Sequence, residues 1–178
     1  STRLRATVTI SAPEASRALP MAAGGCPSAR RVQSFGPAPA AGPGAGEPVD
    51  SALSHWPVQI MLVPPTAPFL KGADLLVLAD CVPVAFPTLH RDFLQGKRVM
   101  LGCPKFDDVE AYIDKFAQIF EQSGIRSITS VVMEVPCCSA LPVIVQKALQ
   151  RSGAKIPQEE VVISVRGKVL RRRQVEAA

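Results

Sequence analysis

The residues of this sequence best suited to chemistry are its five cysteines, which do not form a compact ligand motif. They are Cys26, Cys81, Cys103, Cys137 and Cys138. Their spacing matches neither the C-x-x-C pairs of a zinc ribbon nor the closely spaced cysteines of a ferredoxin. An odd number of cysteines without a secretory signal also argues against a disulfide framework. The chemistry of these thiols therefore depends on where the fold places them.

Three apolar, strand-like runs lead directly into cysteines. The runs and the cysteines after them are residues 74–80 with Cys81, residues 98–102 with Cys103, and residues 127–135 with Cys137 and Cys138. In an open parallel α/β sheet the carboxyl ends of the strands share one edge, where ligands bind. We therefore expect a sulfur-lined site at that edge. Helices that begin after Cys103 and Cys138 are expected to lower the thiol pKa values and favour thiolates.

Four thiolates from four loops suit either a tetrahedral zinc ion or an iron–sulfur cubane. Structural zinc usually takes paired ligands from one knuckle, whereas single ligands scattered over a sheet and flanked by proline favour a cluster. Proline follows Cys26 and Cys103 and precedes Cys137. The adjacent Cys137 and Cys138 do not readily bond to each other, because the small ring strains the peptide. They are metal ligands, a redox pair with outside partners, or packing residues.

The elements that must position these thiols alternate between strands and helices. Strands are predicted at residues 3–10, 58–63, 74–80, 98–102, 127–135 and 161–165, and helices at 87–96, 109–120 and 139–152. This alternation with short loops predicts an α/β, flavodoxin-like three-layer domain with a mostly parallel sheet, plus an N-terminal arm. Right-handed crossovers then put the carboxyl ends of the strands on one side.

Composition divides the chain into four parts. They are an N-terminal arm with Cys26 at residues 1–35, a Pro/Gly/Ala linker at 36–49, an α/β cluster-binding domain at 50–168 and a basic tail at 169–178. The linker buries little and behaves as a semi-extended spacer. It is long enough for Cys26 to fold back onto the domain.

Charge and hydropathy exclude several classes of protein. There is no apolar run long enough to cross a membrane and no secretory signal, so we expect a cytoplasmic protein without a membrane span. The net charge of +5 is concentrated near the C-terminus, and aromatic residues make up only 5% of the chain. Nucleic-acid binding is not expected, because no aromatic side chains interleave with the basic ones. Motifs for nucleotide binding or a serine hydrolase are missing.

Several short segments combine residues in a distinctive way. They are Ser54-His55-Trp56-Pro57-Val58-Gln59, Ala79-Asp80-Cys81-Val82-Pro83, Gly102-Cys103-Pro104-Lys105 with Asp107-Asp108 after it, Met133-Glu134-Val135-Pro136-Cys137-Cys138, and Gly24-Gly25-Cys26-Pro27. Over about residues 24–165 the chain resembles a family of bacterial and archaeal 4Fe-4S ferredoxin-type iron–sulfur cluster-binding oxidoreductases. Members generally carry an N-terminal two-cluster ferredoxin module with closely spaced cysteines. This sequence lacks them, so the resemblance is to the C-terminal domain without that module.

The resemblance implies an iron–sulfur cluster, 4Fe-4S in type, held by Cys26, Cys81, Cys103 and one of Cys137 or Cys138. It implies electron transfer or redox chemistry at that cluster, as a component of an iron–sulfur oxidoreductase. The expected partner is a ferredoxin-like protein or an oxidoreductase subunit, and homo-oligomerisation is left open. Two alternatives remain: a zinc-binding structural or partner-docking module that uses the same thiolates, and a thiol–disulfide redox enzyme.

Overall fold

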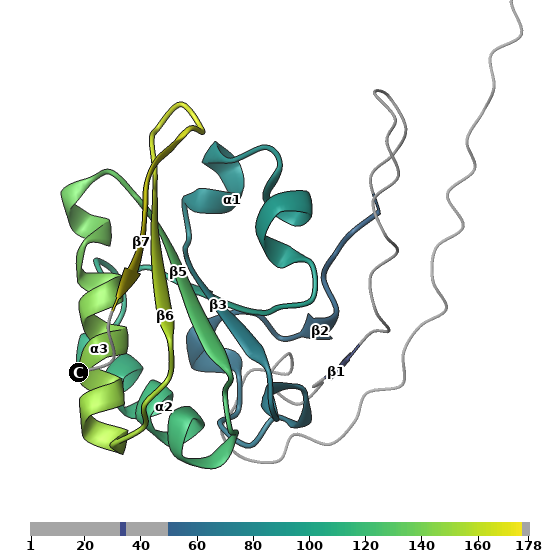
Figure 1. Cartoon of the computed structure of the whole chain (residues 1–178), viewed down its shortest axis with the longest axis vertical. Helices are drawn as coiled ribbons and strands as arrows, with labels where there is room; N and C mark the ends of the chain where they lie inside the picture. Colours follow the sequence, from purple (N-terminus) through teal and green to yellow (C-terminus); the bar gives the residue numbers. More distant parts are fainter. Residues whose placement is uncertain (1–32, 35–49, 176–178) are drawn as a thin grey trace, which may run out of the picture.

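A five-stranded sheet organises the part of the chain that the computed structural model describes, residues 33–34 and 50–175 (Figure 1). Its strands are β3 (Asp74–Ala79), β4 (Arg98–Gly102), β5 (Ser127–Met133), β6 (Gln158–Ile163) and β7 (Val169–Val175). They lie in the order β4-β3-β5-β6-β7. The first four run parallel, and β7 returns antiparallel to β6.

The strand order confirms the predicted flavodoxin-like α/β architecture. Counted along the chain within this sheet, the second strand lies outside the first, and the third, fourth and fifth follow on the other side. This is the 2-1-3-4-5 order of doubly wound flavodoxin-like sheets. The first strand, β3, lies between β4 and β5 in the interior of the sheet. Every residue from Leu75 to Ala79 is buried, as expected for a strand that is covered on both faces.

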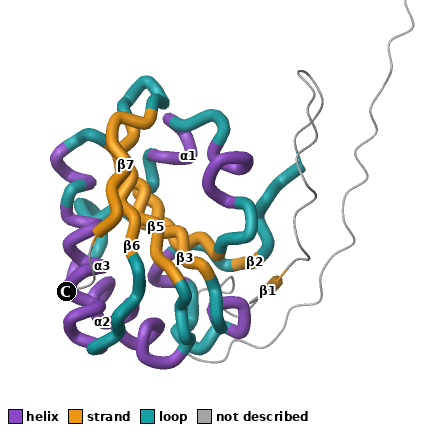
Figure 2. Tube along the Cα trace, in the orientation of Figure 1, coloured by secondary structure: helices purple, strands orange, loops and turns teal. Residues whose placement is uncertain are grey.

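Helices cover the two faces of the sheet, as the three-layer prediction requires. The longer ones are α2 (Val109–Gln122) and α3 (Ala140–Ser152), and shorter turns include α1 (Val82–Ala85) and a π-helical turn at His90–Leu94. Figures 1 and 2 show α2 and α3 side by side on one face and α1 on the other. Among the described residues, no helix is long and apolar enough to cross a membrane.

Both long helices have clear sequence signals at their ends. The Asp108 side chain caps α2 by accepting hydrogen bonds from the amides of Glu110 and Ala111. The apolar stripe of α2, from Tyr112 to Phe120, faces the core. Helix α3 ends at Gly153, whose φ of 68° is the left-handed conformation that favours glycine after a helix.

The run Val58–Val63, predicted as a strand, has a different structure. Only Gln59 pairs with the sheet, in an isolated parallel bridge to Leu101, and residues 60–62 form a 3₁₀ turn. Prolines on both sides of the run limit ladder pairing. Ile60 is fully buried, so the apolar pattern reflects burial and not strand pairing.

The C-terminal residues 169–175, expected to belong to a basic tail, form strand β7. Opposite charges on the neighbouring strand explain the difference. Arg171 and Arg173 pair with Glu160, and Arg172 pairs with Glu159. The α/β domain therefore extends beyond residue 168, and that predicted boundary was wrong.

The N-terminal arm is described only at β1 (Gln33–Ser34), which pairs antiparallel with β2 (His55–Trp56). The predicted strand at residues 3–10 and Cys26 lie outside the described residues. The His55 ring joins this pair to the sheet, since its Nε2 accepts a 2.8 Å hydrogen bond from the amide of Val99 in β4. His55 is fully buried and stacks on Phe69 at 4.3 Å between ring centroids.

The exit of β4 is held by a tightly packed tyrosine. The Tyr112 hydroxyl donates a hydrogen bond to Asp107 Oδ2, which also accepts from the amide of Cys103 at 3.3 Å. A Cβ on Gly102 would overlap the Tyr112 hydroxyl and approach Ile60 Cδ1 to 2.8 Å. Glycine at 102 thus allows α2 to anchor the loop that carries Cys103.

We expect His55 to make the stability of the fold pH-dependent. Burial, together with the positive charge of Arg98, lowers the pKa of His55 from 6.5 to about 4. The unfolded chain therefore binds a proton between pH 6.5 and 4 that the folded chain does not, so stability falls as pH falls through this window. Urea denaturation should show a loss of about 1.5 kcal/mol between pH 6.5 and pH 5 from this group. In His55→Gln the decline over the same range should be smaller, and an identical decline would contradict the assignment.

The Tyr112–Asp107 contact should be energetically coupled. Tyr112→Phe removes the buried hydroxyl donor and should lower the free energy of unfolding by about 1 to 2 kcal/mol. Asp107→Asn should cost a comparable amount, and the double variant should lose less than the sum of the two by about 0.5 kcal/mol or more. Urea denaturation of the four proteins measures this. Strict additivity would show that the hydrogen bond does not hold the loop.

Candidate functional site

The strand order reverses between β3 and β5, and the thiols lie around this point. The chain leaves β3 for β4 on one side and later enters β5 on the other. In doubly wound sheets the loops diverge at such a switch point, and a crevice for ligands opens outside the carboxyl ends. Cys81 follows β3, Cys103 follows β4, and the 3₁₀ turn Pro136–Cys138 follows β5. Three adjacent parallel strands thus deliver thiols to one edge.

The four described cysteines differ in exposure, and none forms a disulfide. Cys81 and Cys137 are exposed, and Cys103 is half-buried. Cys138 is only 4% exposed and belongs to the hydrophobic core. The two members of the doublet therefore have different surroundings, although they are adjacent in sequence.

Cys138 departs from the expected lowering of thiol pKa values by helix N-termini. Burial raises the pKa of the Cys138 thiol, and the neighbouring Cys137 and Cys81 raise it further, while a hydrogen bond with the backbone of Met133 acts in the opposite direction. Desolvation of a thiolate in the core is the largest of these effects. Both Cys81 and Cys137 therefore lie close enough to Cys138 to affect its charge.

Cys103 lies on the other side of β3, and Cys26 lies outside the described residues. The part of the chain that the structure describes contains no group of three or more histidine, cysteine or acidic side chains arranged to hold a metal ion. The structure therefore brings Cys81 and the doublet together and places Cys103 at the same edge, without closing the four positions into one compact set.

Two aspartates near these thiols, Asp80 and Asp107, form an acidic pair that the sequence analysis did not identify. Burial raises the pKa of Asp80, the negative charge of Asp107 adds to this, and a hydrogen bond from the Gln59 side chain opposes it. The two carboxylates follow the adjacent strands β3 and β4. Their negative charges repel, and a further anion placed near them would be disfavoured. The parallel register could have revealed this pair. It sets Ala79 opposite Gly102, so the loops that carry Asp80 and Asp107 begin side by side.

The two histidines take structural positions. His55 joins β2 to β4, as described above. His90 Nδ1 accepts a 3.0 Å hydrogen bond from the amide of Ala52, which ties the N-terminal end of the domain to the π-helical turn. The contacts described for His55 and His90 involve no cysteine of the thiol-lined edge.

Comparison with known proteins places the chain in a family. A family profile described as a Rossmann-like domain matches residues 67–178. A protein from Archaeoglobus fulgidus, recorded as an uncharacterized protein, is 36% identical over 117 residues, which are 66% of this chain and 82% of that relative. No solved structure is significantly similar. With this match over more than half of its length and the sheet described above, the chain belongs to the Rossmann-like domain family.

Proposed function

We propose that this protein binds an iron–sulfur cluster, 4Fe-4S in type, at the carboxyl edge of β3, β4 and β5. The proposed ligands are Cys81, Cys103, Cys137 and Cys26, and the proposed role is electron transfer or redox chemistry in the cytoplasm. The observation that carries the proposal is the delivery of thiols by three adjacent parallel strands at the switch point of the sheet.

The donor set suits a cluster better than a single zinc ion. Four thiolates on zinc lie about 3.8 Å from one another, given Zn–S bonds of about 2.3 Å in a tetrahedron. The described thiols and carboxylates form no group that compact. A cubane carries its thiolates on separate corners and so bridges ligands that are more widely spaced. Three of the proposed ligands come from loops after separate neighbouring strands, which favours the wider arrangement.

Chain length allows Cys26 to complete the set. The arm is fixed to the domain where Ser34 of β1 pairs with His55, and His55 in turn contacts Val99 near the start of β4. The residues between Cys26 and Ser34 span up to about 27 Å when extended. Strand β4 has 5 residues, or about 16 Å at the usual rise. Cys26 can therefore reach the carboxyl edge from this anchor.

The residues of the chain would hold the cluster and tune it. A cluster in this place supplies one-electron chemistry. The exposed Cys81 and Cys137 leave it open to a redox partner protein, such as a ferredoxin-like protein or an oxidoreductase subunit. Cys138 remains a protonated thiol beside Cys137, and the carboxylates of Asp80 and Asp107 would favour the less negative, oxidised state of the cluster.

A thiol–disulfide enzyme is the second candidate, and one observation favours it. Cys81 and Cys137 are exposed thiols that both influence the buried Cys138. Such a group can exchange disulfides with a partner when no cluster is present. The two functions use the same thiols, but they differ in whether iron and sulfide are bound.

Anaerobic purification with metal and sulfide analysis tests the proposal. The protein should be brown, absorb light broadly at about 400 nm, and contain equal molar amounts of iron and acid-labile sulfide. Cys81→Ser and Cys103→Ser should each lose most of the iron, whereas Ser139→Ala, next to the doublet but without a thiol, should keep it. Zinc without sulfide would overturn the cluster in favour of a zinc site. Thiols that alkylate without any release of metal would support the disulfide enzyme.

The doublet gives a sharper prediction. Because Cys137 is exposed and Cys138 is buried in the core, Cys137→Ser should lose the cluster and Cys138→Ser should retain it. Iron content and the absorption spectrum measure the difference. Thermal denaturation of both variants without iron separates loss of a ligand from loss of the fold. Equal and complete loss of iron in both variants would contradict the assignment of Cys137 as the ligand.

A further inference from the structure

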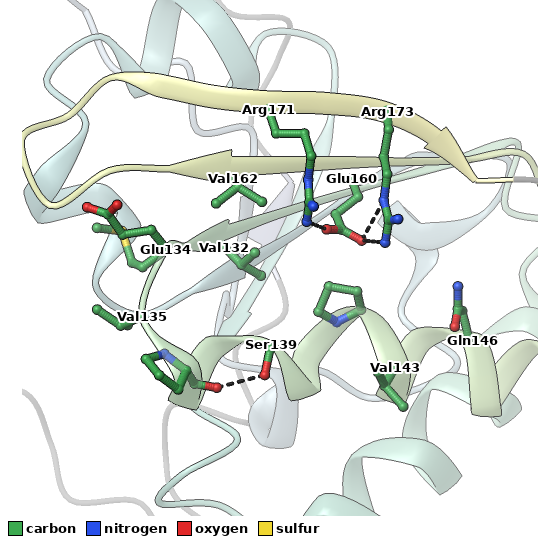
Figure 3. Close-up of a pocket in the computed structure, with 13 residues that line it drawn as sticks. Val132, Glu134, Val135, Ser139, Val143, Gln146, Glu160, Val162, Arg171 and Arg173 are labelled. Carbon is green, nitrogen blue, oxygen red and sulfur yellow. Dashed lines mark hydrogen bonds and ion pairs between the residues drawn. The ribbon is translucent and has the colours of Figure 1, made fainter.

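We propose that the groove between α3 and the β6–β7 half of the sheet binds a small organic carboxylate with an apolar body. A role for this ligand as substrate or effector rests on the proposed function, whereas its binding does not. The groove is a cavity of about 260 Å³ (Figure 3). This volume lies just below the range of about 300 to 1,000 Å³ that is typical of small-molecule pockets, so it suits only a small ligand.

The walls of the groove come from two layers of the fold. The sheet contributes Val132, Val162, Glu160, Arg171 and Arg173, and α3 contributes Pro142, Val143 and Gln146. Figure 3 shows the strands on one side of the space and α3 on the other. The valine and proline side chains form an apolar surface, and β6 and β7 contribute the cluster of Glu160, Arg171 and Arg173 at one end. A ligand that fits both parts has an apolar body and one polar end.

The polar end is organised by a buried carboxylate. The Glu160 side chain is only 7% exposed, and its Oε1 accepts a 2.8 Å hydrogen bond from Arg171 Nη2. Its Oε2 accepts from Arg173 Nη2 at 2.7 Å and from Arg173 Nε at 3.3 Å. One carboxylate thus holds two guanidinium groups in fixed positions. This group of three side chains has a net charge of +1.

Both arginines keep unused donors. Within the described residues, Arg171 uses one nitrogen for Glu160 and Arg173 uses two, so each guanidinium retains N–H groups without a protein acceptor. Their side chains are 57% and 53% exposed, although the carboxylate that they share is buried. Guanidinium groups bind carboxylates with parallel hydrogen bonds. A second carboxylate, from a ligand, would neutralise the remaining charge.

The remaining charged group at the groove, Glu134, adds a negative charge at the end away from the arginine pair. Glu134 lines the far end, where its Oε1 accepts a 2.8 Å hydrogen bond from the amide of Val165 in the β6–β7 hairpin. Its carboxylate is therefore engaged outside the arginine pair, and the dashed lines in Figure 3 join the two arginines to Glu160 and not to Glu134. The Ser139 hydroxyl donates to the carbonyl oxygen of Pro136 at 2.7 Å and leaves the first turn of α3 uncapped.

The position of the groove connects it to the thiols. Residues 133–136 line the groove and then continue into Cys137. The end of the groove away from the arginine pair therefore lies beside the doublet. The free N–H groups of two guanidiniums and an apolar surface fit a single carboxylate with a hydrocarbon body better than inorganic phosphate, whose higher charge the neutral lining of two arginines and two glutamates does not balance.

Binding of phenylacetate to the full chain tests the proposal. Titration followed by calorimetry or ligand-observed NMR should detect binding, and the neutral analogue phenylacetamide should bind at least tenfold more weakly. Arg171→Gln and Arg173→Gln should each weaken phenylacetate binding at least tenfold. Arg172→Gln is the matched control and should change it less than twofold, because Arg172 lies on the opposite face, paired with Glu159 and 5.5 Å from the Phe93 ring.

A second variant avoids the ion pairs. Val143 is 48% exposed and lines the groove, so Val143→Trp should fill the space and abolish binding while the fold remains intact, as judged by thermal denaturation. Cys137→Ser should leave phenylacetate binding unchanged even if iron is lost, which separates this site from the proposed cluster. Lack of binding to the wild-type chain would overturn the proposal. So would equal binding of phenylacetamide, or binding that survives Val143→Trp.

Discussion

The parallel pairing of β3 with both β4 and β5 is the constraint on which the rest of the structure depends. Leu78 lies opposite Leu101 on one side and opposite Val131 on the other, so the three strands share one register. Because β3 is buried on both faces, a slip by one residue would exchange its two faces and is disfavoured by the surrounding core. The common register brings the three thiol-bearing loops to the same edge of the sheet.

Much of the fold could be predicted because burial and periodicity are local signals. The runs that became β3, β4 and β5 are apolar and end at cysteine or proline, and α2 has an apolar stripe with an aspartate before it. The run Val58–Val63 was misread, because burial of Ile60 in a 3₁₀ turn produces the same apolar pattern as a strand. Strand β7 was missed because its stability depends on glutamates of β6, which no local pattern of arginines reveals.

The candidate site could be predicted in outline but not in its electrostatics. The edge of the sheet follows from topology alone, and the four thiols from Cys81 to Cys138 lie within the region that matches the Rossmann-like family, residues 67–178. The raised pKa of Cys138 follows from its depth in the core, a property of packing that the adjacent Cys137 does not share. Likewise, the groove beside the doublet arises because α3 leaves part of β6 and β7 uncovered, which depends on how a helix crosses a sheet.

The separation in sequence between β3 and β5 makes the thiol-lined edge a product of long-range pairing. Strands β6 and β7 are joined by a short hairpin, whereas the pairing of β3 with β5 closes a segment that contains β4 and α2. Closing such a long segment costs chain entropy, which packing of the helices and the sheet must offset. Cys81 therefore lies near the doublet only while this pairing is intact. A change that loosens β3 from β5 would separate these thiols even if each loop kept its local structure.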